Sequence, residues 1–309
     1  LPIYNYMQKI AVLIPCYNES KTIAKVVSDF KSELPEADVY VYDNNSKDNT
    51  IKEAEGAGAI IKKEFRQGKG FVVQKMFREV DADFYVLVDG DDTYPADAVN
   101  NLLEVAKKYN ADMVVGDRLS NGTYGKENKR GFHNFGNLLV KNLVNFFFHA
   151  ELKDIMSGYR VFSRQFVKNY PVLVGGFQLE TDMSIFALDK KFLIKEYPII
   201  YRDRPKGSVS KLNTYSDGLR VLMVIFNLIR YYRPFFYFSI VSIVLVLAAL
   251  FVGVPVIVEY FATGYIKKVP SAIFSSGLMI TAALLLVSGI ILDAVKRSND
   301  ETFEINIKK

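Results

Sequence analysis

The sequence predicts an α/β domain with a mostly parallel, doubly wound sheet, followed by a membrane hairpin of two helices. Three observations carry this prediction. Short apolar or β-branched runs alternate with helical stretches over the first 117 residues, two aspartates directly follow one of those runs, and the C-terminal third holds two long uncharged segments. Strand–helix alternation with short links favours a parallel sheet that is covered by helices on both faces.

Five short runs are typical of buried strands, namely residues 10–14, 39–42, 59–62, 84–88 and 113–115. Between them lie helical stretches such as residues 96–109. The apolar positions of that stretch fall on one helical face, at Val99, Leu102, Leu103 and Ala106. A nucleotide is therefore expected to bind across the carboxyl ends of the first strands.

The run at 84–88 is followed at once by Asp89, Gly90 and Asp91. Carboxylates one residue apart at the end of a buried strand face the crevice where open α/β sheets bind ligands. Two hard oxygen ligands suit a divalent cation that keeps its other positions for water and phosphate oxygens. The sequence thus predicts a metal ion, Mg²⁺ or Mn²⁺, that binds a diphosphate.

Three more motifs fit the same crevice: residues 15–19 after the first strand, residues 43–50 after the second, and Gly68-Lys69-Gly70. In this order with the aspartates, they resemble the family 2 glycosyltransferases with the GT-A fold, over roughly residues 8–215. The second motif of that family usually reads Asp-Asp-Gly-Ser-x-Asp-x-Thr. This chain matches it at Asp43, Ser46, Asp48 and Thr50 and departs from it at Asn44 and Asn45.

The resemblance implies a Rossmann-like catalytic domain and assigns roles to individual residues. It makes Asp89 and Asp91 the metal ligands, where the ion acts as a Lewis acid that neutralises the leaving diphosphate. Asp92 and Thr93 stay outside this assignment. The residues that it places around the nucleotide are Pro15, Tyr17, Asn18, Glu19, Asp43, Lys69 and Gly90. Asn18 and Glu19 are equally compatible with a helix start.

The acceptor decides which further groups the reaction needs. A lipid monophosphate has a second pKa of about 6, so at neutral pH it is already nucleophilic and needs cations rather than a base. Four cations align with those of polyprenyl-phosphate glycosyltransferases, the dolichyl-phosphate mannose synthase-like branch: Arg118, Arg130, Arg160 and Lys211. An alcohol acceptor would need a base, for which Glu180, Asp182 and Asp154 stay open. We favour no base.

Residues 235–258 and 269–292 contain 24 residues each and no charge. At about 1.5 Å per residue, each reaches about 36 Å and can cross a hydrocarbon core of roughly 30 Å. Ten residues separate them, so a two-transmembrane hairpin is expected, with a pair of buried core helices as the alternative. An interfacial amphipathic helix is expected just before the hairpin, because residues 219–229 are polar only at Arg220 and Asn227.

The resulting organisation has four parts: a GT-A domain at 1–213, a juxtamembrane helix at 214–234, the hairpin at 235–292 and a tail at 293–309. Basic residues flank the hairpin at Arg220, Arg230, Arg233, Lys296 and Arg297. By the positive-inside rule, the catalytic domain and both termini are cytoplasmic, in the inner or plasma membrane. No cleavable signal is evident at the N-terminus, and the single Cys16 agrees with a reducing compartment.

Positive charge is concentrated in residues 200–233, which hold seven Lys or Arg against two Asp and so a net +5. Such a collar binds phosphate or anionic headgroups, or serves as a topology signal alone. Residues 132–148 predict a helix with a broad apolar face, packed either on the sheet or against a membrane. Nothing in the chain is typical of a nucleic-acid groove. A homo-oligomer is compatible with the sequence.

The leading hypothesis is metal-dependent, inverting transfer of a sugar from UDP-glucose to undecaprenyl phosphate at the cytoplasmic leaflet, for glycan modification. UDP-N-acetylglucosamine and GDP-mannose are the alternative donors. A processive polysaccharide synthase is disfavoured because such enzymes carry a Gln-x-x-Arg-Trp motif and this chain has no Trp. A membrane-anchored nucleotide-sugar binding protein without turnover is the alternative from another class.

Overall fold

The computed structural model describes residues 8–121, 131–172, 179–202, 226–227 and 230–308, with residues 131–137 described by their backbone alone. The chain forms two compact units, Leu1–Gly218 and Leu219–Lys309. Several predictions fall outside the described residues. These are Arg130, Lys211, most of the basic collar at 200–233, and most of the juxtamembrane helix at 214–234.

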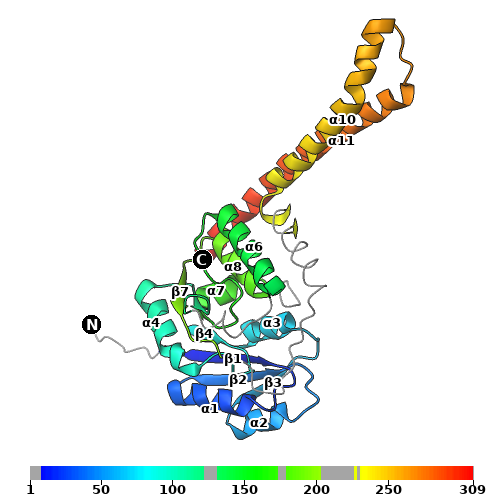
Figure 1. Cartoon of the computed structure of the whole chain (residues 1–309). Helices are drawn as coiled ribbons and strands as arrows, with labels where there is room; N and C mark the ends of the chain where they lie inside the picture. Colours follow the sequence, from blue (N-terminus) through cyan, green and yellow to red (C-terminus); the bar gives the residue numbers. More distant parts are fainter. Residues whose placement is uncertain (1–7, 122–130, 173–178, 203–225, 228–229, 309) are drawn as a thin grey trace. The chain divides into compact units, whose positions relative to one another are not determined.

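The first unit is built on one seven-stranded sheet (Figure 1), whose strand order is β3-β2-β1-β4-β6-β5-β7. All neighbouring strands are parallel except β6, which runs antiparallel to β4 and β5. This confirms the mostly parallel sheet. Its strands are β1 (Ile10–Cys16), β2 (Asp38–Asp43), β3 (Ile60–Lys63), β4 (Phe84–Leu87), β5 (Met113–Asp117), β6 (Arg160–Ser163) and β7 (Ile194–Pro198).

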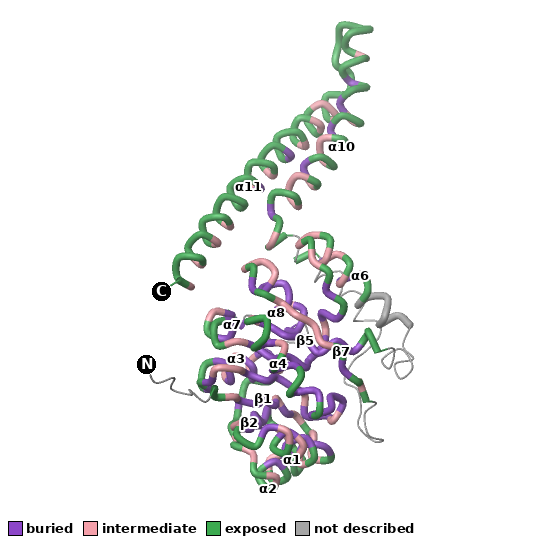
Figure 2. Tube along the Cα trace, turned by 90° about the vertical axis from the view of Figure 1, so that its left-hand side faces the viewer, coloured by how far each residue is buried: buried purple, intermediate pink, exposed green. Residues whose placement is uncertain are grey.

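Helices cover both faces of the sheet, so most residues of its central strands are buried (purple in Figure 2). On one face, α1 (Ile23–Glu33) and α4 (Val99–Tyr109), which follows the short 3₁₀ helix η1 (Ala96–Ala98), pack on aliphatic strand residues such as Val12 and Ile14. The four apolar positions predicted for residues 96–109 are all buried there. Because period-3.6 spacing places them on one side, that side joins the core.

The opposite face is aromatic. Phe162 of β6 stacks on Phe166 of α7 (Arg164–Asn169) with ring centroids 4.9 Å apart, and Phe77 of α3 (Lys69–Glu79) meets Phe162 edge-on at 5.8 Å. Phe186 of α8 (Leu179–Asp189) extends the cluster to Phe166 at 5.9 Å. Stacked and edge-to-face pairs add stabilisation beyond the area that they bury.

The chain passes from β1 to β2 and β3 on one side and then returns to β4 on the other side of β1. The short α2 (Thr50–Gly56) connects β2 and β3. A reversal of strand order leaves a crevice beyond the carboxyl ends of the strands, which is where α/β sheets bind ligands. The carboxyl ends of β2, β1 and β4 therefore border one site.

The helix predicted at 132–148 is α6 (Gly131–Phe148). Val140 and Val144 are buried, and the helix contacts α8, so it packs within the first unit. Leu138 and Phe146 lie on the other side and are exposed.

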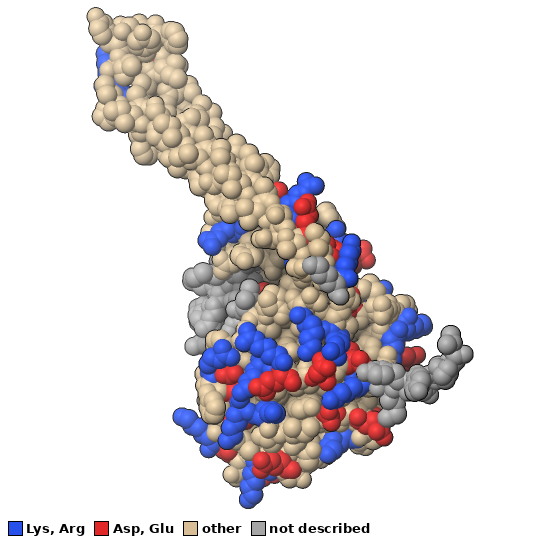
Figure 3. All heavy atoms as spheres, turned by 180° about the vertical axis from the view of Figure 1, so that it is seen from behind, with Lys and Arg blue, Asp and Glu red and all other residues tan. Residues whose placement is uncertain are grey.

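The second unit is a hairpin of α10 (Pro234–Thr263) and α11 (Val269–Ile307), both long and apolar enough to cross a membrane. In Figure 3 the charged side chains are interspersed over the α/β unit, whereas the apolar helices show few. Small residues line their contact: Ser242 Oγ donates to Ala282 O, and Ser275 Oγ donates to Ala249 O, each at 2.8 Å. Small residues allow close approach of helices in lipid.

Candidate active site

The four sequence motifs follow three neighbouring strands and open one helix. Residues 17–19 follow β1, Asp43 ends β2, and Asp89 and Asp91 follow β4, while Lys69 is the first residue of α3. The strands align so that Cys16 of β1 pairs with Asp43 of β2. The structure thus brings the motifs to one edge of the sheet, as the sequence predicts for a ligand crevice.

Side-chain-to-backbone hydrogen bonds join the first motif to the second. The Asn18 N–H donates to Ser46 Oγ at 2.9 Å, and the Lys47 N–H returns to Asn18 Oδ1 at 2.8 Å. The Glu19 N–H donates to Thr50 Oγ1, also at 2.9 Å. Ser46 and Thr50 therefore hold the two loops together, and Asn18 is one half of a reciprocal pair rather than a plain helix start.

Asp43 and Asp48 organise the second motif from within. The Ser46 N–H donates to both oxygens of Asp43, at 3.2 and 3.3 Å, and the Thr50 N–H donates to Asp48 at 3.0 Å. Asp48 also accepts from the Ser20 N–H at 3.2 Å. Burial works against the charge of Asp48, but its hydrogen bonds with Thr50 and Ser20 outweigh it and lower the pKa of its carboxyl.

Asp91 is buried, and Thr93 holds one of its oxygens. Thr93 donates to Asp91 Oδ1 from its hydroxyl at 2.7 Å and from its N–H at 3.2 Å. Gly90 lies between the two aspartates, and a Cβ there would come within 2.7 Å of Cys16 Sγ. Its carbonyl accepts from Thr22 Oγ1 at 2.6 Å. A glycine is therefore required for the close approach of this turn to β1.

Lys69 extends between two carboxylates. Its Nζ lies 2.5 Å from Asp89 Oδ1 and 2.6 Å from Glu180 Oε1. Burial disfavours the ammonium, but the negative charges of Asp89 and Glu180 outweigh burial and raise its pKa above the ordinary value. Lys69 therefore carries a fixed positive charge in the crevice. The flanking glycines Gly68 and Gly70 mark Lys69 in the sequence, but the sequence does not predict its ion pair with Glu180, 111 residues away.

The aspartates fit a divalent cation by their chemistry. They supply hard oxygens, and the ammonium of Lys69 shows that a positive charge is accommodated against Asp89. Gly158 leaves space beside the second oxygen, since a Cβ there would come within 2.6 Å of Asp89 Oδ2. Among the described residues, no group of three or more His, Cys, Asp or Glu side chains could hold an ion. Water and a diphosphate would have to complete the coordination.

Arg118, predicted to bind the acceptor phosphate, forms a buried ion pair with Asp154. Its Nε donates to Asp154 Oδ2 at 2.7 Å and its Nη2 to Oδ1 at 2.9 Å. Burial opposes the charge of Asp154, but Arg118 outweighs it and lowers the pKa of that carboxyl. The N–H groups of Lys153 and Asp154 are in turn held by Glu196, whose pKa is raised by burial.

Arg160 does not face the crevice surface, and this revises its prediction as a direct ligand of the acceptor. The residue is fully buried, and its guanidinium donates to Ser157 O and Ile155 O at 2.8 Å and to Ser184 Oγ at 3.0 Å. Its guanidinium therefore holds the backbone carbonyls of the 155–157 loop in place. Of the four predicted cations, Arg118 is paired, Arg160 is enclosed, and Arg130 and Lys211 lie outside the described residues.

The contacts of two tyrosines are not predicted by the sequence. Tyr94 accepts from the Gly158 N–H at 2.9 Å and from Arg118 Nη1 at 3.4 Å, so it joins the loop beside Asp89 to the Arg118 pair. Tyr170 donates to Asp182 Oδ2 at 2.6 Å. No local sequence signal marks either tyrosine, because each contact joins distant parts of the chain.

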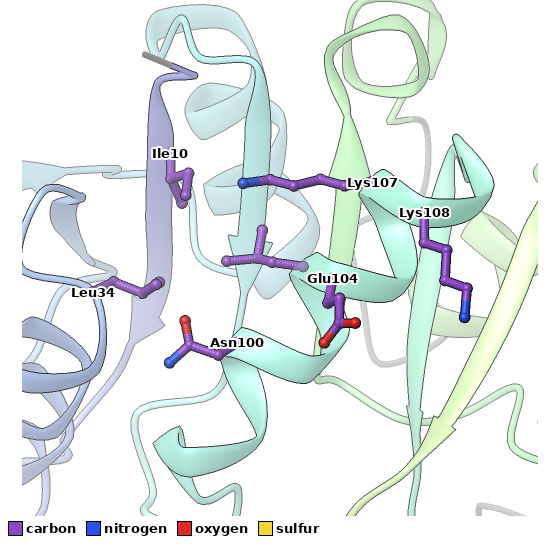
Figure 4. Close-up of a pocket in the computed structure, with 7 residues that line it drawn as sticks. Ile10, Leu34, Asn100, Glu104, Lys107 and Lys108 are labelled. Atoms are coloured by element: carbon purple, nitrogen blue, oxygen red, sulfur yellow. The ribbon is translucent and has the colours of Figure 1, made fainter. Parts of the chain in front are cut away.

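A separate surface hollow of about 370 Å³ lies near the amino-terminal end of β1, away from the carboxyl ends of the strands (Figure 4). Its lining includes Ile10, the first residue of β1, together with Leu34, Asn100 and Lys107. It contains none of the four motifs and is not connected with the crevice chemistry.

Comparisons with known proteins agree with this arrangement. The model of the family described as "Glycosyl transferase family 2" matches residues 11–170. Protein RfbJ of Shigella flexneri is 53% identical over 120 residues, which cover 38% of this chain and 93% of RfbJ. Glycosyltransferase AglJ of Haloferax volcanii is 29% identical over 93% of both chains. Dolichyl-phosphate hexose transferase of the same organism is 27% identical, over 69% of this chain and 90% of its own.

Among solved structures, glucosyl-3-phosphoglycerate synthase from Mycobacterium tuberculosis in complex with Mn²⁺ and UDP-glucose superimposes with a TM-score of 0.55. The match covers 72% of this chain and 78% of that one, at 20% sequence identity. The likeness confirms the GT-A fold.

Proposed function

The chain belongs to glycosyl transferase family 2, and on that premise we propose that it transfers a sugar from a nucleotide diphosphate to polyprenyl phosphate. The observation that carries the proposal is the placement of Asp89, Asp91 and Lys69 at the carboxyl edge of the sheet. Carboxylates for a divalent cation and a partly buried ammonium suit a diphosphate leaving group, whose charge grows as the glycosidic bond breaks.

Asp89 and Asp91 would hold Mg²⁺ or Mn²⁺. When bound, such an ion supplies Lewis-acid stabilisation of the leaving diphosphate. Lys69 adds a second positive charge beside Asp89. Asp43 keeps carboxylate oxygens at the end of β2, where they can accept hydrogen bonds from ribose hydroxyls or a uracil imide. Pro15, Tyr17, Asn18, Glu19 and Gly90 complete the proposed nucleotide site.

Polyprenyl phosphate is the proposed acceptor because two features support it. The chain has two helices long and apolar enough to cross a membrane, and a relative that matches 69% of it is a dolichyl-phosphate hexose transferase. A phosphate dianion needs no general base. In keeping with this, each carboxylate that could act as a base already has a partner: Glu180 binds Lys69, Asp154 binds Arg118, and Asp182 accepts from Tyr170.

The finer assignments belong to the same proposal. UDP-glucose is the preferred donor and undecaprenyl phosphate the preferred acceptor, with inversion at the anomeric carbon. Arg118, Arg130 and Lys211 serve the acceptor phosphate, while Arg160 supports the 155–157 loop. The catalytic domain and both termini face the cytoplasm, where the nucleotide sugar is made.

The test offers purified full-length protein polyprenyl phosphate, Mn²⁺ or Mg²⁺, and a panel of radiolabelled sugar nucleotides in separate reactions. We expect label in an organic-extractable product from one donor, with UDP-glucose first among them. Polyprenol without phosphate serves as the matched acceptor control and should yield no product. Absence of lipid-linked label from every donor would refute the proposed reaction.

A further inference from the structure

Asn44 stands where the related family pattern has a second aspartate, and it is buried at the end of β2. We propose that its side-chain amide is a positioning group that sets the 64–68 loop, so that the Lys69 ammonium lies between Asp89 and Glu180. Only the consequence for donor binding rests on the proposed function; the positioning itself does not.

All hydrogen-bonding capacity of this amide is used. Its Nδ2 donates to Glu64 O at 2.8 Å and to Arg66 O at 2.9 Å, while Oδ1 accepts from the Gly68 N–H at 2.7 Å and from Gln67 Nε2 at 3.2 Å. A primary amide has two N–H donors and two acceptor lone pairs, so no capacity is left over. A fully satisfied buried network of this kind fixes one geometry.

The network ends one residue before Lys69. Gly68 has φ of 137°, in the region that favours glycine, and its N–H is the one that Asn44 holds. Lys69 then begins α3, and its Nζ meets Asp89 and Glu180 at 2.5 and 2.6 Å. The Asn44 backbone N–H also donates to Cys16 O at 2.9 Å, which anchors the amide to β1. Asn44 thus contacts the end of β1 through its backbone, and through its side chain it holds the loop up to Gly68, the residue before α3.

An aspartate of the same size could not replace this amide. A carboxylate has no donor, so Glu64 O and Arg66 O would lose their partners and face a negative charge. A buried acceptor without a partner is costly, and the loop would have to move away. The departure at position 44 therefore has a chemical reason in this chain.

The test measures how fast Lys69 is acetylated by limiting acetic anhydride in the full-length protein in detergent, followed by mass spectrometry. We expect Asn44→Asp to raise the rate at Lys69 about tenfold, because the ammonium loses its fixed place between two carboxylates. The exposed Lys107 serves as the internal reference. An unchanged rate at Lys69 in folded Asn44→Asp would overturn the proposal.

The matched control is Asn145→Asp, which removes an amide that binds the Leu152 backbone at 2.8 and 3.1 Å, away from Lys69. Its Lys69 rate should stay at the wild-type value; an equal rise there would overturn the proposal by showing general loosening. Asn44→Ser, which keeps one hydroxyl donor, is the second variant if Asn44→Asp does not fold. Its rate at Lys69 should lie above that of Asn145→Asp, and equality of the two would again overturn the proposal.

Titration of UDP with Mn²⁺ separates this inference from the proposed function. Asn44→Asp should bind UDP about tenfold more weakly than the wild type. Faster acetylation of Lys69 with unchanged UDP affinity would support the positioning and contradict Lys69 as a donor ligand. Unchanged acetylation would contradict the positioning, whatever the UDP affinity.

Discussion

Every carboxylate that was considered as a general base is engaged by a neighbouring side chain. Glu180 binds Lys69, Asp154 binds Arg118 through two contacts, and Asp182 accepts from Tyr170. A base must be within reach of the proton that it removes and must be able to accept it. These pairings favour a nucleophile that arrives already deprotonated, as a phosphate dianion does.

A substitution at Gly158 would show whether activity depends on the observed position of the Asp89 carboxylate. Gly158→Ala should lower the transfer rate about 100-fold with little change in stability, because the new Cβ would displace the Asp89 carboxylate from its present position. Initial rates with saturating donor and acceptor would measure the loss. Gly56→Ala is the control, since a Cβ there meets no atom within 4 Å. Full activity of Gly158→Ala would mean that Asp89 does not need its observed position.

Asp182 gives a pH-dependent prediction. Burial raises the pKa of its carboxyl above the ordinary value, although the Tyr170 hydroxyl partly offsets this. The folded state therefore holds this proton more tightly than the unfolded state, and stability falls as pH rises from about 4 through the folded pKa. Asp182→Asn, which keeps an oxygen for Tyr170, should melt above the wild type at pH 7, and the difference should shrink towards pH 4. A difference independent of pH would contradict this cause.

The aspartates at the end of β4 could be predicted from sequence, because a buried strand imposes where its next residues lie. The ion pair of Lys69 with Glu180 could not, because it joins residues 111 positions apart and depends on how α8 packs. Arg160 shows the converse. Its positive charge predicted a ligand of the acceptor phosphate. In the structure it lies in the buried strand β6 and is fully enclosed by protein.

At the scale of elements, the five strands that were predicted are apolar or β-branched runs, and the two that were missed are not. β6 carries Arg160 and Ser163 among its four residues, and β7 holds the charged pair Lys195 and Glu196 and ends at a proline. β7 is an edge strand, where charged residues and proline are tolerated. Because β7 contains no apolar run, the sequence does not predict it as a strand.

The hairpin depends on close contact between its helices. Gly289→Ala should destabilise it by about 1–3 kcal/mol, because a Cβ there would come within 2.8 Å of Phe238 Cβ. Thermal unfolding of the full chain in detergent would measure this. Gly277→Ala on the same helix is the matched control, as a Cβ there meets nothing within 4 Å. Equal stability of the two variants would contradict the close packing at Gly289.

At the scale of the whole molecule, the chain combines a family 2 glycosyltransferase unit with two helices able to cross a membrane. This combination suits an enzyme whose donor is soluble and whose acceptor is anchored in lipid. The family and the fold followed from motif order and strand–helix alternation, since both are local properties. The identity of the sugar depends on a few hydrogen bonds across the crevice, which spacing in the sequence does not encode.

The most direct test of the central claim is the rate at which Asp91→Asn transfers labelled sugar to polyprenyl phosphate with Mn²⁺ present. Asn keeps the size of the side chain and an oxygen for Thr93, so the fold should persist. We predict a rate at least about 100-fold below the wild type, because the carboxylate charge that holds the cation on the diphosphate is gone. Transfer by Asp91→Asn at the wild-type rate would contradict the account.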